Sequence, residues 1–355
     1  MLNESAVLLI ATETPLHAGG GTSLGAVDLP IQRERHTQYP MVQASGIKGA
    51  LRDLAYSARK IDAEARRKFK DERKPALDRV DRHEKPGEMA EAFFSLESAF
   101  GPETDRADAH AGALSFSDAR ILLFPVRSLR GVFAWVTSPF ALERFARDLE
   151  RAGGRVPWSV PRIQETEAWT GSKSTIRVDT DAIVLEECHF PSPTGDRCTA
   201  VDRIAEHLAE VVGVFGVGDG AHGYWRERLW GAKESGAGET NLVILSDTAF
   251  RDFVLFSTEV VSRIRVNPET GTVASGALWS EEHLPSDTVL YALVLSDAPR
   301  GVRTETAHDA AGVMKLLRGV IEEQPLSVVQ LGGDETVGRG FVRMRLYEPR
   351  DGRGG

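Results

Sequence analysis

The sequence predicts an α+β fold built on an antiparallel sheet. Segments rich in β-branched and aromatic residues open and close the 355-residue chain, and segments with helical periodicity lie between them. A helix follows the first strand and a hairpin stands near the end of the chain, which is compatible with a ferredoxin-like core. Residues 60–110 and 150–240 would be insertions into that core. The length fits one large domain or two ordinary ones.

Local patterns assign the elements in order. Apolar and β-branched runs bounded by turn residues predict strands at residues 7–12, 114–117, 119–124, 131–137, 242–245, 289–295, 328–331 and 341–347. Apolar residues at helical spacing predict helices at residues 47–60, 140–151, 200–212 and 304–322. Ser45 is the expected N-cap of the first helix. The apolar stripe of that helix consists of Ile47, Leu51, Leu54, Ala55 and Ala58.

Two segments have a less regular pattern. Residues 60–92 are rich in charge and poor in apolar residues, which is typical of a mobile insertion or an exposed helix. Residues 213–240 hold many glycines together with Tyr224, Trp225 and Trp230. We interpret this second segment as a long functional or mobile loop.

Composition limits the class of protein. Hydrophobic residues make up 41% of the chain, enough for a proper core. No apolar run approaches the roughly 20 residues of a membrane helix, and the N-terminus lacks the charged region and cleavage site of a secretory signal. We therefore expect a cytoplasmic protein with reduced cysteines. Cys188, His189 and Cys198 form a poor zinc pattern, because no second pair follows at ligand spacing.

The charge is unevenly distributed. The formal net charge of -9 and the pI of about 5.6 argue, taken alone, against a nucleic-acid binder. Residues 31–80, however, hold thirteen Lys or Arg against seven Asp or Glu. A basic strip on an acidic body can bind one strand and repel nucleic acid elsewhere. The acidic remainder suits a subunit that lies beside other subunits, and a merely soluble surface explains it equally well.

A glycine-rich loop follows the first strand and carries His17 and Asp28. Its three consecutive glycines, residues 19–21, allow close approach of a backbone or a phosphate. The loop matches neither the phosphate-loop pattern nor the dinucleotide fingerprint, so a nucleotide cofactor is not expected. Farther on, Lys48 and Arg52 share a face of the first helix. This face could follow the phosphates of a nucleic acid, or it could simply be solvated.

Four segments together resemble a known family. These are residues 16–35, the helix start at residues 45–52, the hairpin of residues 261–266 and 276–285, and the glycine-rich residues 331–340. They resemble the RAMP superfamily, and within it the backbone subunit of the type III-B CRISPR effector, the Cmr complex. Residues 27–34 distinguish this subunit from its type III-A counterpart. The resemblance spans the chain and is patchy through residues 60–240.

The resemblance implies an architecture and a function. It implies a single RAMP domain, residues 1–355, with an RRM-like palm, a thumb hairpin at about residues 260–290 and a C-terminal glycine-rich loop at residues 331–340. It implies an antiviral, endoribonuclease-active subunit that binds guide crRNA as a multimer and cleaves complementary single-stranded target RNA at regular intervals. The implied partners are crRNA, target RNA, other copies of the chain and other Cmr-type subunits. The implied cofactor is a divalent metal ion, Mg²⁺ or Mn²⁺.

The resemblance also implies roles for individual residues. The family's catalytic aspartate falls at Asp28, which we expect to act as a base or as a metal ligand, although an aspartate in a loop is most often a turn-former. His17 is either a second acid/base group or a residue that packs or contacts RNA. Glu281 and His283 alternate along an extended segment and would face one way. The family has a glutamate and an aromatic hydroxyl residue in this segment, and here Ser280 and His283 take the place of a tyrosine.

We expect RNA to be held by the glycine loops and by nearby cations. The predicted RNA-binding residues are Gly19, Gly20, Gly21, Ser45, Lys48, Arg52, Gly332, Gly333, Gly338, Arg339 and Gly340. Two other functions remain open from the sequence. One is a non-catalytic RNA-binding scaffold of a type III complex, in which Asp28 is structural. The other is a stand-alone enzyme that processes guide RNA.

Overall fold

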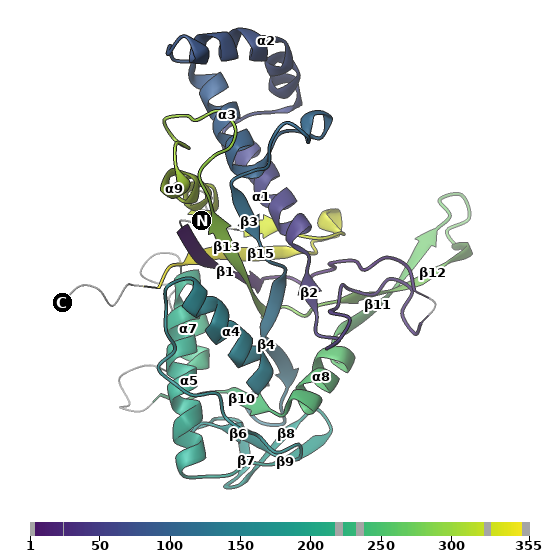
Figure 1. The fold of residues 1–355 in the computed structure, drawn as a ribbon. Helices are drawn as coiled ribbons and strands as arrows, with labels where there is room; N and C mark the ends of the chain where they lie inside the picture. The colour runs from purple at the N-terminus through teal and green to yellow at the C-terminus, as the bar shows by residue number, and fades with distance from the viewer. Residues whose placement is uncertain (1–3, 24, 217–222, 232–237, 323–327, 350–355) are drawn as a thin grey trace, which may run out of the picture.

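The computed structural model describes residues 4–23, 25–216, 223–231, 238–322 and 328–349. Its architecture is α+β, with helices on both sides of a ten-stranded sheet (Figure 1). The sheet strands are β1 (Glu4–Thr12), β2 (Met41–Val42), β3 (Leu114–Phe116), β4 (Ala119–Arg127), β5 (Phe133–Thr137), β6 (Ala168–Thr170), β10 (Leu242–Leu245), β13 (Val289–Ser296), β14 (Val328–Gln330) and β15 (Phe341–Tyr347).

The sheet brings the two ends of the chain together. Its order is β14-β15-β1-β13-β4-β5-β10-β6, with β2 also paired to β4 and β3 to β13. The described pairs are antiparallel except for β5 and β10, which run parallel, so the sheet is mixed and the purely antiparallel prediction is wrong at this place. Residues 138–241 separate these two strands in the chain. Two parallel neighbours need a long connection of this kind, because the chain must return to the end of the sheet where the first strand began.

The helices and the smaller strands complete the fold. The described helices are α1 (Ala44–Ala58), α2 (Ala63–Asp81), α3 (Glu88–Phe100), α4 (Pro139–Arg151), α5 (Asp196–Val212), α7 (Gly223–Leu229), α8 (Asp247–Phe256) and α9 (Ala310–Glu322). A second sheet contains β7 (Arg177–Asp179), β8 (Ala182–Leu185) and β9 (Cys188–Pro191). A separate antiparallel hairpin, β11 (Glu259–Val266) and β12 (Val273–His283), projects from the body (Figure 1).

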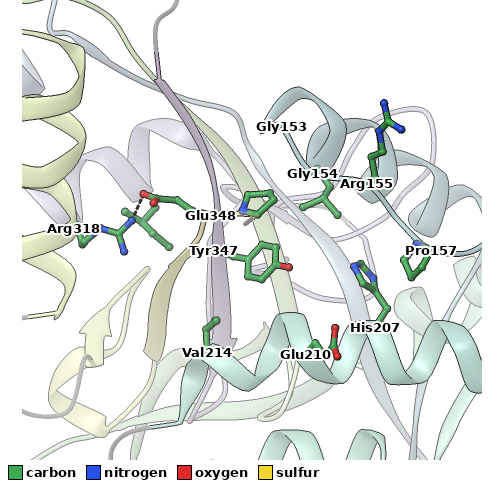
Figure 2. Close-up of a pocket in the computed structure, with 13 residues that line it drawn as sticks. Gly153, Gly154, Arg155, Pro157, His207, Glu210, Val214, Arg318, Tyr347 and Glu348 are labelled. Atoms are coloured by element: carbon green, nitrogen blue, oxygen red, sulfur yellow. Dashed lines mark ion pairs between the residues drawn. The ribbon is translucent and has the colours of Figure 1, made fainter. Parts of the chain in front are cut away.

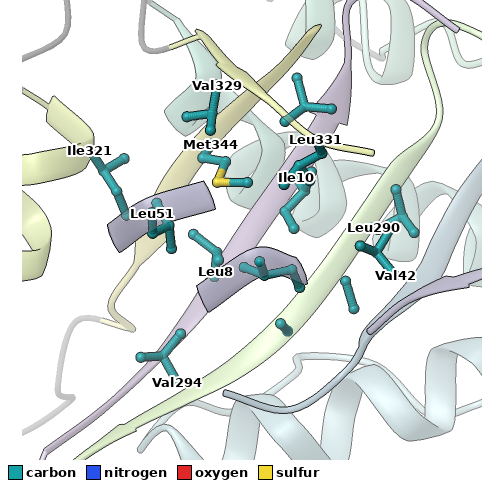
Figure 3. Packing of buried hydrophobic residues seen from close by; sticks show 14 of the residues in the cluster. Leu8, Ile10, Val42, Leu51, Leu290, Val294, Ile321, Val329, Leu331 and Met344 are labelled. Carbon is teal, nitrogen blue, oxygen red and sulfur yellow. The ribbon is translucent and has the colours of Figure 1, made fainter. Parts of the chain in front are cut away.

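Strand β1 is buried on both faces. Leu8 and Ile10 belong to one hydrophobic core, which α1, α3 and α9 cover, as Figure 3 shows for part of that core. Val7 and Leu9 belong to a second core on the opposite face, which α4 and α5 cover. Because successive side chains of a strand point to opposite faces, both cores depend on one continuous apolar run. Truncation of Leu8 to alanine should therefore cost about 2–5 kcal/mol.

Helix α1 begins one residue earlier than its predicted cap. Gln43 precedes the helix and makes no side-chain cap, so the prediction of Ser45 as N-cap is wrong. Instead, the N–H of Ala44 donates a 2.8 Å hydrogen bond to Oδ1 of Asp118, from the turn between β3 and β4. This carboxylate satisfies one of the free N–H groups of the helix start, and its negative charge suits the helix dipole. Ser45 lies in the first turn and is exposed.

The other differences lie in the segments between the strands. The charged residues 60–92 contain the largely exposed helix α2, which agrees with the exposed-helix alternative, and Asp62 caps it by accepting from the N–H of Ala65. The predicted helix at residues 304–322 begins only at Ala310. The predicted loop at residues 213–240 contains helix α7, and its residues 217–222 and 232–237 lie outside the described residues. Sequence patterns missed α3, which is buried along most of its length and so lacks one clear apolar stripe.

Within the described ranges, none of the helices combines the length and the apolar character that a membrane crossing requires.

Candidate functional site

Three distant segments meet at the base of the β11–β12 hairpin. The backbones of Leu16 and Leu284 exchange two hydrogen bonds of 2.9 Å, which joins the loop after β1 to the segment after β12. The C-terminal glycine-rich loop lies against the same segment, because the N–H of Gly333 donates to the carbonyl of His17 at 3.0 Å. The N–H of Gly340 donates to the carbonyl of Pro15 at 2.9 Å. These contacts place the predicted site residues of both chain ends beside the hairpin.

Two of the predicted RNA-binding glycines are required by this packing. Gly332 has a φ of 72°, and a Cβ built on it would overlap the carbonyl oxygen of His17. Gly340 has a φ of 73°, and its Cβ would overlap the carbonyl oxygen of Leu331. Only glycine combines this left-handed conformation with such close approach. Their role in RNA binding remains a prediction, and their role in packing is now a sufficient reason for glycine.

Asp28 is exposed and is bound to the hairpin through Ser280. Its Oδ2 accepts hydrogen bonds of 2.8 Å from both the backbone N–H and the hydroxyl of Ser280. The N–H of Asp28 donates in turn to Oγ of Ser280 at 3.0 Å. The two Ser280 donors, the backbone N–H first, lower the pKa of Asp28 from its ordinary value. The carboxylate is therefore negatively charged near neutrality and fixed in orientation, with its Oδ1 not bound by another described residue.

Glu282 fixes the loop that carries Asp28. The backbone of Leu29 bonds to both neighbours of Glu281, donating to the carbonyl of Ser280 and accepting from the N–H of Glu282, each at 3.0 Å. The buried carboxylate of Glu282 accepts from the N–H of Ile31 at 3.0 Å. It also forms a 2.5 Å ion pair with Arg33. Sequence reasoning missed Glu282, although the adjacent Glu281 and Glu282 of one strand had to face opposite ways.

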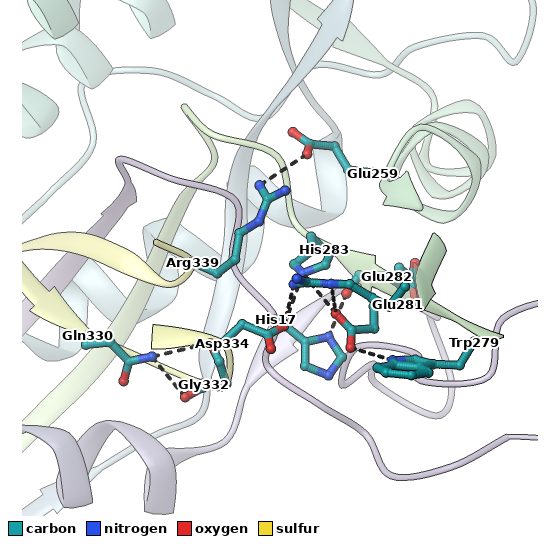
Figure 4. Close-up of polar contacts among 12 residues, drawn as sticks. His17, Glu259, Trp279, Glu281, Glu282, His283, Gln330, Gly332, Asp334 and Arg339 are labelled. Atoms are coloured by element: carbon teal, nitrogen blue, oxygen red, sulfur yellow. Dashed lines mark hydrogen bonds and ion pairs between the residues drawn. The ribbon is translucent and has the colours of Figure 1, made fainter. Parts of the chain in front are cut away.

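The opposite face of β12 carries a second polar cluster, formed by Glu281, His283 and Asp334 (Figure 4). Nε2 of His283 lies 3.6 Å from Oδ2 of Asp334 and 4.0 Å from Oε2 of Glu281. Arg263 of β11 contacts both carboxylates, at 2.8 Å to Glu281 and 3.2 Å to Asp334. Nε1 of Trp279 donates to the other oxygen of Glu281 at 2.7 Å. The expectation that Glu281 and His283 face one way agrees with this geometry, and Asp334 was not predicted.

The two histidines lie next to each other. The rings of His17 and His283 are 5.4 Å apart between centroids. Nδ1 of His17 donates to the carbonyl oxygen of Glu282 at 2.7 Å, which leaves Nε2 as the acceptor of the neutral ring. Burial, together with the nearby Arg339 and His17, lowers the pKa of His283. His283 is therefore neutral at physiological pH.

The predicted RNA-binding cations each contact a different part of the protein. Nζ of Lys48 donates to the carbonyl of Leu114 at 2.8 Å, and burial lowers the pKa of this lysine. Arg52 lies over the ring of Tyr56, 5.8 Å from its centroid. Arg339 approaches Glu259 at 3.9 Å, beside the polar cluster. The remaining predicted residues, Gly19, Gly20, Gly21, Ser45, Gly333 and Gly338, are exposed or half-buried. Arg339 and His17 thus both lie near His283, whereas the contacts of Lys48 and Arg52 are with Leu114 and Tyr56.

A cavity of about 1170 Å³ lies apart from these residues, between α4, α5 and the end of β15 (Figure 2). Its lining contains positively and negatively charged side chains, among them Arg155, Glu210 and the ion pair of Arg318 with Glu348. Its lining includes none of the predicted site residues. The candidate site is instead the exposed surface around Asp28 and the base of the hairpin, as suits a chain-like ligand.

The fold and this site define the class of protein: the chain belongs to the RAMP superfamily, whose family model matches residues 9–343. The chain is 36% identical, over 338 residues, to the "CRISPR system Cmr endoribonuclease Cmr4" of Pyrococcus furiosus, covering 95% of this chain and 94% of that protein. It is 24% identical over 348 residues to the "CRISPR system CMR subunit Cmr4" of Saccharolobus solfataricus, again covering 95% of this chain and 94% of that protein.

Solved structures agree with this assignment. The structure superposes on oligomeric Cmr4 from Pyrococcus furiosus with a TM-score of 0.62 at 30% identity, covering 98% of this chain and 99% of that chain. A chain of the type III-B Cmr-beta complex bound to cognate target RNA has the same fold, with a TM-score of 0.60 at 19% identity, covering 97% of this chain and 98% of that chain.

Proposed function

We propose that this chain is the backbone subunit of a type III-B CRISPR effector, which binds guide crRNA as a multimer and cleaves complementary target RNA at regular intervals. The relationship to the Cmr endoribonuclease of Pyrococcus furiosus over nearly the full length supports this function. Asp28 carries the chemical part of the proposal. It is an exposed, ionised carboxylate on a glycine-rich loop, and Ser280 holds it in one orientation.

The proposed reaction uses the RNA's own nucleophile. Base pairing with the guide would select the target, while the protein reads shape and phosphates. A kink in the target would place a ribose 2′-oxygen in line with the leaving 5′-oxygen. Asp28 would then accept the 2′-hydroxyl proton or help to hold a divalent ion. The products would be one fragment with a 5′-hydroxyl and another with a cyclic or terminal phosphate.

The proposed metal dependence fits one feature of Asp28. Both Ser280 donors bind to Oδ2, and no other described residue donates to Oδ1. A single free carboxylate oxygen suits Mg²⁺ or Mn²⁺ held chiefly by RNA phosphates and water. When bound, such an ion would neutralise charge on the scissile phosphate. His17, Glu281 and His283 remain proposed contributors, of which His17 has a ring nitrogen available as an acceptor.

We also propose that the core of the sheet is ferredoxin-like and that the β11–β12 hairpin acts as a thumb. The hairpin exposes large apolar side chains, among them Val260, Ile264 and Leu278. Such side chains can act as a wedge between base pairs. One hairpin and one RNA-binding surface per chain make a head-to-tail contact, which propagates along a guide strand.

The decisive experiment compares Asp28→Asn with the unchanged protein in the assembled complex. Asparagine keeps the shape and one acceptor oxygen for Ser280 but removes the charge. Cleavage of target RNA should fall to background, while guide and target binding remain. Target RNA with a 2′-deoxy sugar at each cut position should bind and resist cutting.

Two results would contradict this proposal. Normal cutting by Asp28→Asn would make the chain a non-catalytic scaffold. Normal cutting of the 2′-deoxy target would make water the nucleophile.

A further inference from the structure

We infer that Glu281, His283 and Asp334 form a binding site for one resident divalent transition-metal ion, of the Zn²⁺ or Mn²⁺ class. Each residue offers one ligand atom, and the three atoms lie within 4.8 Å of one another. The site lies between the hairpin and the C-terminal glycine-rich loop (Figure 4). It is on the face of β12 opposite to the side chain of Ser280, which binds Asp28. It differs from an ion that joins Asp28 and RNA during cleavage, because protein side chains alone hold it.

Unpaired polar atoms indicate that a ligand belongs at this place. His283 is fully buried, with 0% exposure, and neither of its ring nitrogens has a hydrogen-bond partner. Oδ2 of Asp334, 3.6 Å from Nε2 of His283, has no hydrogen-bond partner either. Buried polar groups are nearly always paired, so several unpaired atoms that face one another need an explanation. One cation between them would satisfy Nε2 of His283 and Oδ2 of Asp334 at once.

The spacing suits a common ion. Zinc binds imidazole nitrogen and carboxylate oxygen at about 2.0–2.2 Å, so two ligand atoms at a tetrahedral angle lie about 3.4 Å apart. The distances from Nε2 of His283, 3.6 Å to Asp334 and 4.0 Å to Glu281, exceed that value by a few tenths of an ångström. A small inward movement of the carboxylates, of which Asp334 is 27% exposed, would complete the site. That exposure also provides a path from solvent.

The types of ligand select the class of metal. Mg²⁺ prefers oxygen ligands and keeps several waters, whereas an imidazole with carboxylates suits Zn²⁺ or Mn²⁺. Among the described residues, Arg263 contacts both carboxylates, and Arg339 lies near His283 without an ion pair to either of them. Nη2 of Arg263 has no hydrogen-bond partner, although it lies 3.2 Å from Asp334. The guanidinium therefore leaves Nε2 of His283 and Oδ2 of Asp334 without hydrogen-bond partners.

An ion at this site would hold the C-terminal glycine-rich loop against the hairpin. Asp334 belongs to the loop that also binds the carbonyl of His17 through Gly333. Glu281 and His283 belong to the strand whose opposite face holds Asp28 through Ser280. The ion would thus fix the position of the hairpin base relative to the loop of Asp28, and Glu281 and His283 would contribute to cleavage through this position.

Metal binding to the RNA-free, tag-free full chain tests the inference. The protein is freed of metal with a chelator and dialysed against Zn²⁺, Mn²⁺ or Mg²⁺, and bound metal is measured by mass spectrometry. We expect one tightly bound Zn²⁺ per chain, weaker Mn²⁺ binding at the same site and no competition from Mg²⁺. Asp334→Asn and Glu281→Gln should each weaken binding by about tenfold or more. Pulsed electron paramagnetic resonance of bound Mn²⁺ should detect a directly coordinated ¹⁴N.

The controls separate this site from other carboxylates. Glu335→Gln changes an exposed carboxylate next to Asp334 and should bind metal normally. Asp28→Asn should also bind normally, so that loss of cleavage and loss of resident metal are independent results. Circular dichroism of each metal-free variant verifies its fold. The inference is overturned if the unchanged chain binds no ion, if Asp334→Asn binds as tightly as the unchanged chain, or if Asp28→Asn loses the ion.

Discussion

Asp28 and Ser280 form a reciprocal pair across 252 positions of sequence: the carboxylate accepts two hydrogen bonds from Ser280, and its own N–H donates to the serine hydroxyl. A loop residue near the start of the chain is thereby fixed to the base of a hairpin near its end. The pair keeps the carboxylate charged and limits its rotation without burying it. Accessibility and orientation, which usually oppose each other in an exposed side chain, are combined here.

Removal of the serine hydroxyl should raise the pKa of Asp28. In Ser280→Ala the backbone N–H bond, the larger cause of the shift, remains, so the pKa should stay below its ordinary value. The side-chain carboxyl resonance of Asp28, followed by ¹³C NMR over pH, measures the change directly. Ser262→Ala is the matched control, because Ser262 lies opposite Ser280 on β11 and is exposed. An unchanged titration in Ser280→Ala would show that the hydroxyl does not bind the carboxylate in solution.

Loss of the Glu282 charge should destabilise the protein. Glu282→Gln removes the negative charge that pairs with Arg33, and both side chains are about nine-tenths buried. Breaking one side of a buried pair costs about 3–5 kcal/mol. Urea denaturation should therefore show a clearly lower midpoint. Glu187→Gln, which changes an exposed partner of Arg127, should leave the midpoint in place. Equal midpoints for the two variants would mean that Glu282 does not hold the loop.

Alanine should have opposite effects at two glycines. Gly332→Ala should destabilise the protein by about 1–3 kcal/mol, because its φ of 72° is left-handed and its Cβ would overlap the His17 carbonyl. Gly46→Ala should stabilise it by about 0.5–1 kcal/mol, since Gly46 lies in α1 with open space around its Cβ. Thermal unfolding of both variants measures the difference. A stabilising Gly332→Ala would show that the two glycine loops do not touch.

The stability of the metal-free protein should fall as pH falls below neutrality. Burial lowers the pKa of His283 from its ordinary 6.5. Below pH 6.5 the unfolded chain therefore binds a proton at this histidine more readily than the folded chain does. The stabilisation is fully present above pH 6.5 and is lost as pH falls toward the lowered folded value. Urea unfolding at several pH values, with a chelator present, should show this slope.

The slope has a second contributor. His207 is also shifted downward by burial, so His283→Gln should reduce the slope without abolishing it. An unchanged slope in His283→Gln would mean that this ring takes up its proton in the folded state as easily as in the unfolded chain.

The fold could be predicted where patterns are local. Strand β1 is apolar on both faces, α1 has a regular apolar stripe, and the last two strands flank a glycine-rich turn. The shared face of Glu281 and His283 follows from the two-residue period of a strand. Helix α3 could not be predicted in this way, because residues around its whole circumference are buried. The start of α1 could not either, since the carboxylate of Asp118 that binds it lies 74 positions away.

The site required the tertiary structure for the same reason. Asp334 joins His283 only because β15 pairs with β1, and β1 with β13, which no local pattern specifies. Glu281 and Glu282 are neighbours in the sequence, and they differ only in the face of β12 from which each side chain projects: Glu281 pairs with Arg263 and Glu282 with Arg33. Family resemblance indicated Asp28 through a motif, whereas the partner that holds it, Ser280, becomes evident only when the hairpin base is placed beside the loop.

The place of β1 between β13 and β15 has a consequence for biosynthesis. Strand β1 is among the most apolar segments of the chain, yet both of its neighbours come far later in the sequence. During translation it therefore has no strand beside it, and sheet closure waits until the last residues of β15 have emerged. The nascent chain should depend on chaperones that shield exposed strand edges, and premature termination before β15 should yield aggregates rather than a truncated subunit.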